Sequence, residues 1–494
     1  MELFIRNRSS ILSILVILIV IALLLNGMSA PTAASVLLSG VTLAALYFLI
    51  ASGVSLIFGL MDVLNFAHGS LFMIGAYAGW TFYTNPRLIF NTAPLALTVI
   101  AGVSFGNVFA GRVSVARWAR WVAALAAIAI MLLAMRDLPL DRLVAMGTSM
   151  TGKVIPTAEA EEPVAAMLAR LGIAFAAGVA LCFAMRTPGK QLGARSAQRA
   201  GRLVVVFAVA ALAMLFARDL SEQLILGMES DLRFGFALAF GAMTGALIGA
   251  LMEWGLIRPL YARPIYQILL TLGLVFVFDQ IVRLVYGPAG AFMDMPSFFA
   301  SSGKDCPSPD MISWLSQHCD SISVLGRPFP SYRLFIIAIG IVMLLAIVLI
   351  LQRSRLGMII RAGVQDSEMV EALGINVRRV FTLVFALGAG LAGLGGVVAA
   401  PFLGVYPDMA MEFLLQAFIV VVIGGLGSVP GAAVGALLVG LARAYGDHIV
   451  LAGIQLPWMT DSISGSPAIA RASTVLIMAI VLFIKPTGIF GKKE

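Results

Sequence analysis

The feature that most constrains the fold is a series of long apolar segments that recurs along the whole chain. A helix needs about 20 mostly apolar residues to cross a bilayer. At about 1.5 Å per residue, the segments 202–217 and 411–426 reach only about 24 Å, so tilted, re-entrant or protein-packed helices are expected there. The pattern predicts an all-α fold, a polytopic integral membrane bundle of fourteen helices. They lie near residues 9–27, 34–58, 64–83, 92–110, 118–135, 164–185, 202–217, 234–257, 265–286, 332–352, 379–403, 411–426, 430–446 and 472–485.

Composition supports this interpretation. Of the 494 residues, 61% are hydrophobic and 12% are charged, whereas soluble domains are about 45–50% apolar and about 25% charged. These values exclude a water-soluble globule and an intrinsically disordered chain. The net charge of +8 is better explained by basic residues retained on the cytoplasmic side of a membrane than by nucleic-acid binding.

The distribution of basic residues predicts the orientation of the chain. With the N-terminus placed in the cytoplasm, the inside loops hold twenty Lys and Arg residues and the outside loops hold nine. Basic loops stay on the cytoplasmic side, so both termini of this multi-pass membrane protein are expected there. The first apolar segment is long for a signal peptide and is predicted to remain as a membrane helix.

Cysteine and histidine are too scarce and too scattered for a metal site, and no cofactor is expected. The long outside loop 287–331 contains Cys306 and Cys319. A disulfide between these two cysteines is predicted if the loop faces an oxidising space, and two free thiols are the alternative.

No residue pattern indicates catalysis on this chain. The stretch Gly147–Lys153 is similar to a phosphate-binding loop, but Val154 stands where a Ser or Thr should bind Mg²⁺. The glycine pattern from Gly388 to Gly393 lies inside an apolar segment without a preceding strand, which favours close helix packing. The chain is therefore not expected to be an enzyme.

The segment 353–378 is the most informative polar region. Asp366 or Ser367 can cap a short amphipathic helix that runs to Leu373, and Gly374 supplies its C-terminal turn. This helix is either an ordinary solvated connector or a docking element for another subunit. For docking, the candidate residues are Asp366, Glu368, Glu371, Ala372, Gly374 and Ile375.

Two further clusters place polar or helix-breaking residues at the ends of apolar segments. The first holds Asn65, His68 and Gly69, and the second holds Gly425, Gly427 and Ser428. Each is either an interfacial turn or part of the lining of a substrate path, because polar groups and broken helices at membrane depth are tolerated beside a cavity or inside protein.

Charges inside the apolar segments raise the same question. Asp279 and Arg283 are four residues apart, which favours a structural ion pair on one helix face.

Together these regions resemble the branched-chain amino-acid permeases of ABC importers, with similarity over 34–84, 233–286 and 332–491. The chain is similar to an H-type membrane subunit extended by an insert. The matching stretches are LIFGLMDVLNFAHGSLFMIGAY, LIRPLYARPIYQILLTLGL, RSRLGMIIRAGVQDSEMVEALGINVRRVFTLVFALGAGLAGLGGV, IGGLGSVPGAAVGALLVG and KPTGIFG.

The resemblance implies a type II-like ABC importer permease and a division of the chain into parts. Segment 353–378 would then contain the coupling helix that docks on an ATPase, although Leu373 departs from the family's Glu-Ala-Ala-like motif. The expected parts are an N-terminal transmembrane part with the NFAHG motif (1–87), an insert of extra transmembrane segments (88–232), a transmembrane core (233–286), a periplasmic loop (287–331) and a second core part carrying the coupling loop (332–494).

The implied function is transport of branched-chain or other small hydrophobic amino acids across the inner membrane. Partners in such a system are a second permease subunit, two ATP-binding subunits that hydrolyse the ATP, a periplasmic solute-binding protein and membrane lipid. The alternatives are a urea or short-amide permease of the same family, or a stand-alone ion-coupled secondary transporter.

Overall fold

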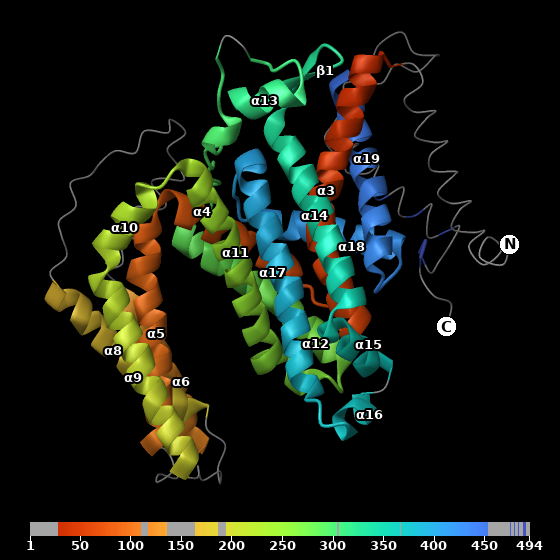
Figure 1. Cartoon of the computed structure of the whole chain (residues 1–494). Helices are drawn as coiled ribbons and strands as arrows, with labels where there is room; N and C mark the ends of the chain where they lie inside the picture. Colours follow the sequence, from red (N-terminus) through yellow and green to blue (C-terminus); the bar gives the residue numbers. More distant parts are fainter. Residues whose placement is uncertain are drawn as a thin grey trace. The chain divides into compact units, whose positions relative to one another are not determined.

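A computed structural model shows a predominantly helical chain (Figure 1). It divides into two compact units: unit 1 comprises Met1–Trp80 and Glu229–Glu494, and unit 2 comprises Thr81–Met228. The residues that the structure describes are 28–109, 117–135, 164–185, 194–303, 306–365, 367–452, 475, 479, 483 and 488–490.

Unit 1 contains most of the described helices and a small two-stranded sheet. Its elements are α3 (Ala30–Met61), most of α4 (His68–Thr84), α11 (Ser230–Met252), α12 (Pro264–Tyr286), α13 (Met311–Gln317), β1 (Ser321–Val324), β2 (Arg327–Pro330), α14 (Ser331–Arg353), α15 (Arg355–Gln365), α16 (Ser367–Ala372), α17 (Val377–Leu403), α18 (Met409–Gly424) and α19 (Val429–Ala452). Unit 2 contains α5 (Pro86–Phe109), α6 (Arg117–Met135), α8 (Val164–Ala184), α9 (Ala194–Phe216) and α10 (Arg218–Leu226).

Small residues bring the helices at the centre of unit 1 into backbone contact. A Cβ atom added at Gly75 of α4 would lie 2.5 Å from the carbonyl oxygen of Gly393 in α17. A Cβ atom at Gly393 would in turn lie 2.6 Å from the carbonyl oxygen of Gly241 in α11. Helices that lack side chains at their crossing points pack closely in lipid. The glycine spacing therefore reflects packing of α4, α11 and α17, as predicted for the Gly388–Gly393 pattern.

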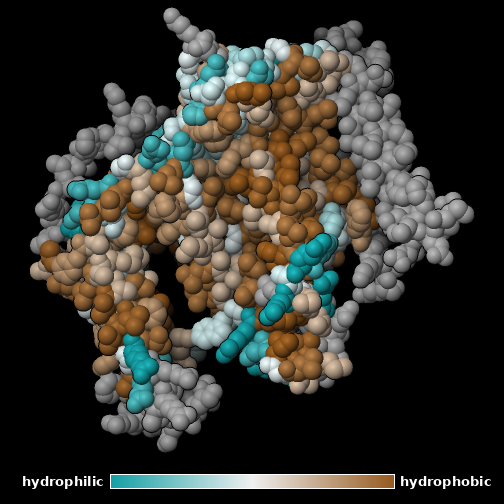
Figure 2. Space-filling model, in the orientation of Figure 1, coloured by the Kyte–Doolittle hydropathy of each residue, from teal (hydrophilic) through white to brown (hydrophobic). Residues whose placement is uncertain are grey.

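The outer helices of unit 1 expose apolar side chains along most of their length. In α14 the most apolar stretch has a mean hydropathy of 3.5, yet only 17% of it is buried. In Figure 2 the hydrophobic residues of unit 1 cover the middle of the visible face, and hydrophilic residues gather toward its two ends. This distribution is typical of a surface in contact with lipid. The chain is an all-α, multi-pass membrane protein.

Each predicted apolar segment that the structure describes forms a helix. Eight helices among the described residues are long and apolar enough to span a membrane, or nine if the pair bent by 60° after Phe216 forms one span. The short segment 411–426 becomes α18, which falls below spanning length. The predicted segments 9–27 and 472–485 lie outside the described residues, except for positions 475, 479 and 483.

The two ends of unit 1 carry different structures (Figure 1). The loop between α12 and α14, with α13 and the β1–β2 hairpin, lies at one end, and α15 and α16 lie at the other. In the hairpin Ile322 pairs with Phe329 in antiparallel register. The Sγ atoms of Cys306 and Cys319 form a disulfide in this loop.

The end with α15 and α16 is rich in arginine. The described arginines there belong to the α11–α12 connection and to the segment from the end of α14 to the start of α17. They are Arg258, Arg263, Arg353, Arg355, Arg361, Arg378 and Arg379. These residues are all in loops that the sequence predicted to lie on one side, so the fold brings together the basic loops that were assigned to the same side.

Candidate functional site

The connection between α3 and α4 leaves the helical conformation inside the protein. After Met61, Asp62 adopts a left-handed backbone conformation with φ of 53°, and residues 62–67 form no helix before α4 begins at His68. Val63 and Ala67 are buried. Non-helical backbone at membrane depth is tolerated where protein surrounds it, and the burial of this segment meets that condition.

His68 lies against the interior of two long helices. A Cβ atom added at Gly53 of α3 would lie 2.6 Å from the Nε2 atom of His68, and Gly53 itself packs against Gly388 of α17. The neighbouring ring of Phe66 lies 4.9 Å from that of Phe418 in α18. These contacts lie on interior turns of α3, α17 and α18, so the motif is buried inside unit 1.

Several buried polar atoms around this motif have no hydrogen-bond partner among the residues that the structure describes. The Oδ1 atom of Asn65 accepts a hydrogen bond from the Ala67 backbone at 3.0 Å, but its Nδ2 atom has no partner. The Oγ atom of Ser70 and the Oε1 atom of Gln416 are also without partners. The His68 ring is fully buried. Buried polar groups of this kind are costly unless something else pairs with them.

The second predicted cluster forms the turn between α18 and α19. Gly425 and Gly427 have φ values of 100° and 77°, which glycine adopts at little cost. The Oγ atom of Ser428 accepts a hydrogen bond from the Gly431 backbone at 3.1 Å. A Cβ atom added at Gly59 near the end of α3 would lie 2.6 Å from the Cα atom of Gly427, so this turn is fixed by backbone contact.

The two predicted clusters do not form a single site. Gly69 packs against Ala410 and Leu414 in the first turns of α18, whereas Gly425 follows the last residue of that helix. The second cluster instead contacts a C-terminal motif: a Cβ atom added at Gly488 would lie 2.7 Å from the Cα atom of Gly425. The sequence contains both motifs, but their separation along α18 depends on the fold.

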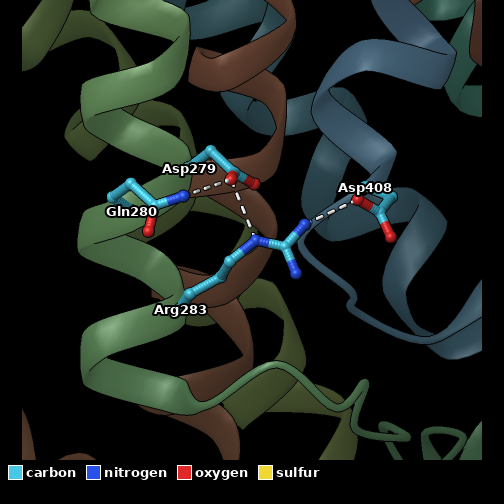
Figure 3. Close-up of polar contacts among 4 residues, drawn as sticks. All are labelled: Asp279, Gln280, Arg283 and Asp408. Atoms are coloured by element: carbon cyan, nitrogen blue, oxygen red, sulfur yellow. Dashed lines mark hydrogen bonds and ion pairs between the residues drawn. The ribbon is translucent and has the colours of Figure 1, made fainter.

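A group of ion pairs lies near the C-terminal end of α12 (Figure 3). The Nε atom of Arg283 is 2.9 Å from the Oδ2 atom of Asp279, which confirms the ion pair predicted from their spacing. The Nη2 atom of Arg283 also lies 2.6 Å from Oδ1 of Asp408, the residue that precedes α18. Sequence reasoning missed this second partner because it lies 125 residues further along the chain.

The predicted short helix is present as α16, from Ser367 to Ala372, and Gly374 follows it with φ of 83°. Val370 is buried, whereas Met369 and Leu373 are 60% and 74% exposed. Glu371, Ala372 and Gly374 are exposed, and Ile375 is half-buried. Asp366 lies outside the described residues, and the side chain of Glu368 is not described.

The base of this segment packs on the core. Val377, Val380 and Phe381 of α17 line an apolar recess with Ile360 of α15 and Leu60 of α3. Asn376 begins α17 by accepting a hydrogen bond from the Arg379 backbone through its side chain. The segment therefore has an exposed part at residues 371–374 and a packed part that contacts α3 and α17.

Within the described ranges, no three His, Cys, Asp or Glu side chains are arranged to hold a metal ion.

Comparisons with known proteins identify the family. The sequence model of the family described as "Branched-chain amino acid transport system / permease component" matches residues 163–484. The chain is 26% identical over 267 residues to the high-affinity branched-chain amino acid transport system permease protein LivH of Escherichia coli K12, covering 53% of this chain and 77% of the relative.

Two other relatives are also permease proteins. BraD, of a high-affinity branched-chain amino acid transport system in Pseudomonas aeruginosa, is 31% identical over 35% of this chain and 52% of its own length. LsrD, of an autoinducer 2 import system in Salmonella paratyphi B, is 25% identical over 52% of this chain and 68% of its own length.

No solved structure matches the chain significantly. The relatives are membrane subunits of transporters and not enzymes, and the family belongs to ABC importer systems. The family model covers well over half of the chain, including α11, α12 and the segment with α15 and α16. The chain belongs to the branched-chain amino acid transport permease family.

Proposed function

We propose that the chain is the permease subunit of an ATP-driven importer that moves branched-chain or other small hydrophobic amino acids across a bacterial inner membrane. The observation that carries this proposal is the segment around the short helix α16, where Met369 in the helix and Leu373 directly after it are exposed at the arginine-rich end of unit 1. Exposed apolar side chains on a short polar segment are typical of a protein interface.

In this proposal the exposed part of the segment docks on an ATP-binding partner. Glu371, Ala372, Gly374 and Ile375 would contact the partner together with Asp366 and Glu368. Two ATP-binding subunits, a second permease subunit and a periplasmic solute-binding protein would complete the complex. Nucleotide binding shifts the permease between its inward-open and outward-open states only if the ATPase binds these states with different affinity.

The division of the chain would follow its predicted parts. Residues 1–87, 233–286 and 332–494 would form the transport core, residues 287–331 the periplasmic loop and residues 88–232 an insert. Unit 2 covers a similar range to that insert. Both termini would lie in the cytoplasm because the basic loops at the α15–α16 end favour that side.

The substrate path would include the interior motif at the start of α4. The unpaired Nδ2 atom of Asn65, the buried His68 ring and the close contact at Gly69 support this role, because polar groups inside a membrane protein tend to mark pathways. Gly425, Gly427 and Ser428 would form the path's cytoplasmic boundary. The second permease subunit would then face the helices next to this motif.

A second solute class has support from one relative, since LsrD belongs to an autoinducer 2 import system. An ion-coupled secondary transporter has less support, because Asp279 is ion-paired rather than available to a coupling ion. Uptake of radiolabelled leucine, competed by valine, by urea or by autoinducer 2, distinguishes the solutes. Competition by valine alone is expected, and competition only by another solute would change the substrate assignment.

Labelling of introduced cysteines tests the orientation. Glu371→Cys in α16 and Ser316→Cys in α13 are both exposed sites, Cys182 is buried and the other two cysteines are bonded to each other. A membrane-impermeant maleimide should label Ser316→Cys in intact cells and Glu371→Cys only after permeabilisation. Labelling of Glu371→Cys from outside would exclude docking on a cytoplasmic ATPase.

A further inference from the structure

A buried carboxyl group occupies the junction of three helices near the arginine-rich end. The last turn of α11 continues as a π-helical turn, Glu253–Ile257, and Glu253 is the first residue of this turn. Glu253 is fully buried. In the part of unit 1 that the structure describes, no cation lies within ion-pairing distance of this carboxyl group.

Two hydroxyl groups hold this carboxyl group in place. The hydroxyl of Tyr261 donates a hydrogen bond to Oε1 of Glu253 at 2.5 Å. The Oγ1 atom of Thr382 lies 2.5 Å from Oε2 of the same carboxyl group. We call these three residues the Glu253 joint.

The Glu253 joint connects the region between α11 and α12 to α17, the helix that follows α16 in the chain. Tyr261 lies in the short connection that leads into α12. Thr382 lies in the second turn of α17, six residues after Asn376, the residue at which the segment passes into the helix. Thr382 is therefore less than two helical turns from the end of the segment that contains α16. Its hydrogen bond to Glu253 links that segment to the π turn, and Tyr261 links Glu253 to the connection before α12.

The rest of the contact between α11 and α17 is close packing at glycine residues. Along the helices, Gly241, Gly245 and Gly249 lie against α17 at positions where a side chain would clash. Burying a carboxyl group costs free energy that apolar packing would not. The hydrogen-bonded contact at the end next to α16 is directional, and a satisfied buried polar network holds its groups in one arrangement.

We propose that Glu253 is a positioning residue that transmits movement of the α16 segment to α11 and α12. This inference rests on the proposed function, since the movement in question is driven by the ATP-binding partner. The hydroxyls of Tyr261 and Thr382 are the contacts through which it acts. Glu253 itself touches neither solute nor nucleotide.

The test measures coupling in the complete complex, reconstituted in proteoliposomes with its partner subunits. The measured quantity is the amount of solute transported per ATP hydrolysed. Glu253→Ala removes both hydrogen bonds, and we expect this ratio to fall at least tenfold while ATP hydrolysis and complex assembly persist. Tyr261→Phe and Thr382→Val each remove one contact and should lower the ratio by a smaller factor.

Two matched variants separate positioning from general stability. Glu253→Gln keeps an acceptor for the Tyr261 hydroxyl. Its amide NH₂ can donate to Oγ1 of Thr382 while that hydroxyl donates to the Arg378 carbonyl oxygen, so the ratio should stay within twofold of that of the wild type. Glu229→Ala changes an exposed glutamate at the other end of α11 and should leave the ratio unchanged. An unchanged ratio in Glu253→Ala, or an equal fall of assembly, hydrolysis and uptake in both Glu253 variants, would overturn the inference.

A second readout does not depend on ATP-driven uptake. Spin labels at Glu371→Cys in α16 and at Leu269→Cys, an exposed position in α12, report the distance between the two elements. The distance distribution should broaden in Glu253→Ala and remain narrow in Glu253→Gln. Equal widths in the two variants would refute the positioning role of Glu253. A wild-type complex without ATP-dependent uptake would refute the proposed function instead, and the spin-label distances would still decide the inference.

Discussion

The Nη2 atom of Arg283 in α12 lies 2.6 Å from the Oδ1 atom of Asp408, which precedes α18, and this contact joins two segments far apart in the chain (Figure 3). The side chain of Asp408 is 81% exposed and that of Arg283 is 30% exposed. Ion pairs this accessible contribute about 1 kcal/mol or less. The contact therefore links α12 to the start of α18 but contributes little to the stability of the fold.

Loss of this accessible ion pair should have only a small effect on stability. Asp408→Asn should lower the unfolding free energy by about 0.5 kcal/mol, and high salt should erase the difference. Arg283→Ala should cost more, because it leaves Asp279 without its ion-pair partner. Thermal unfolding of the purified protein at low and high salt measures both effects. An Asp408→Asn protein less stable than Arg283→Ala would contradict this order.

The glycine contacts at the centre of unit 1 predict a strong effect of added methyl groups. Gly75→Ala places a Cβ atom against the backbone of Gly393, and overpacking of this kind costs about 1–3 kcal/mol. Gly273→Ala in α12 is the matched control, because no atom lies within 4 Å of an added Cβ atom. Thermal unfolding should show a lower transition for Gly75→Ala only. An equal stability of the two variants would contradict the close packing of α4 and α17.

The disulfide in the loop between α12 and α14 is expected to stabilise this loop rather than the helices. Cys306 and Cys319 are 13 residues apart, and closing a loop of about this length contributes up to about 3 kcal/mol. Cys306→Ser should make this loop sensitive to protease while the helices stay resistant. Mass spectrometry of unreduced protein should find neither cysteine alkylated. Alkylation of both cysteines without reduction would exclude the disulfide.

The Asp310 cap of α13 predicts a pH dependence in the same loop. Its carboxylate accepts hydrogen bonds from the backbone and the hydroxyl of Ser313 at 2.7 Å and 2.8 Å. The backbone hydrogen bond is the main cause that lowers the pKa of Asp310. A lowered pKa means that the stabilisation is present above the pKa of the unfolded chain and is lost as the pH falls through the folded value.

Hydrogen exchange of residues 311–317 measures this loss. Protection should fall as the pH drops below the ordinary range of an aspartate, after correction for the intrinsic exchange rate. Asp310→Asn keeps a capping oxygen and should show no such pH dependence. The same pH dependence in Asp310→Asn would assign it to another group.

The turn after α16 predicts a selective loss of partner binding. Gly374 has φ of 83° and open space around it, so Gly374→Val meets backbone strain of about 1–2 kcal/mol rather than a clash. Gly326 in the β1–β2 turn has the same φ and the same open space, which makes Gly326→Val the control. Co-purification of the ATP-binding subunit should fall for Gly374→Val only, and equal recovery with both variants would contradict docking at α16.

The sequence predicts those parts of this structure that depend on local patterns. Apolar length indicates helices such as α14, and the spacing of Asp279 and Arg283 indicates their ion pair. Gly374 ends α16 as expected because a left-handed turn is favourable for glycine. Each of these features depends on residues within a few positions of one another.

Contacts between distant segments could not be predicted from the sequence. Nothing local to Arg283 indicates Asp408, and nothing local to Glu253 indicates Thr382, 129 residues away. The burial of Asn65 inside unit 1 also depends on how α3, α17 and α18 surround it. Apolar periodicity does not specify which helix faces which, because lipid-facing and protein-facing surfaces of a membrane helix are similarly apolar.

In the proposed function, this permease takes its energy from an ATP-binding partner through α16. The most direct measurement is leucine uptake into vesicles that contain the complete complex, with a partner ATPase that either hydrolyses ATP or carries a substitution that prevents hydrolysis. Uptake should require the active ATPase and should persist when ionophores collapse the proton and sodium gradients. Uptake that continues with the inactive ATPase and stops with the ionophores would contradict the account.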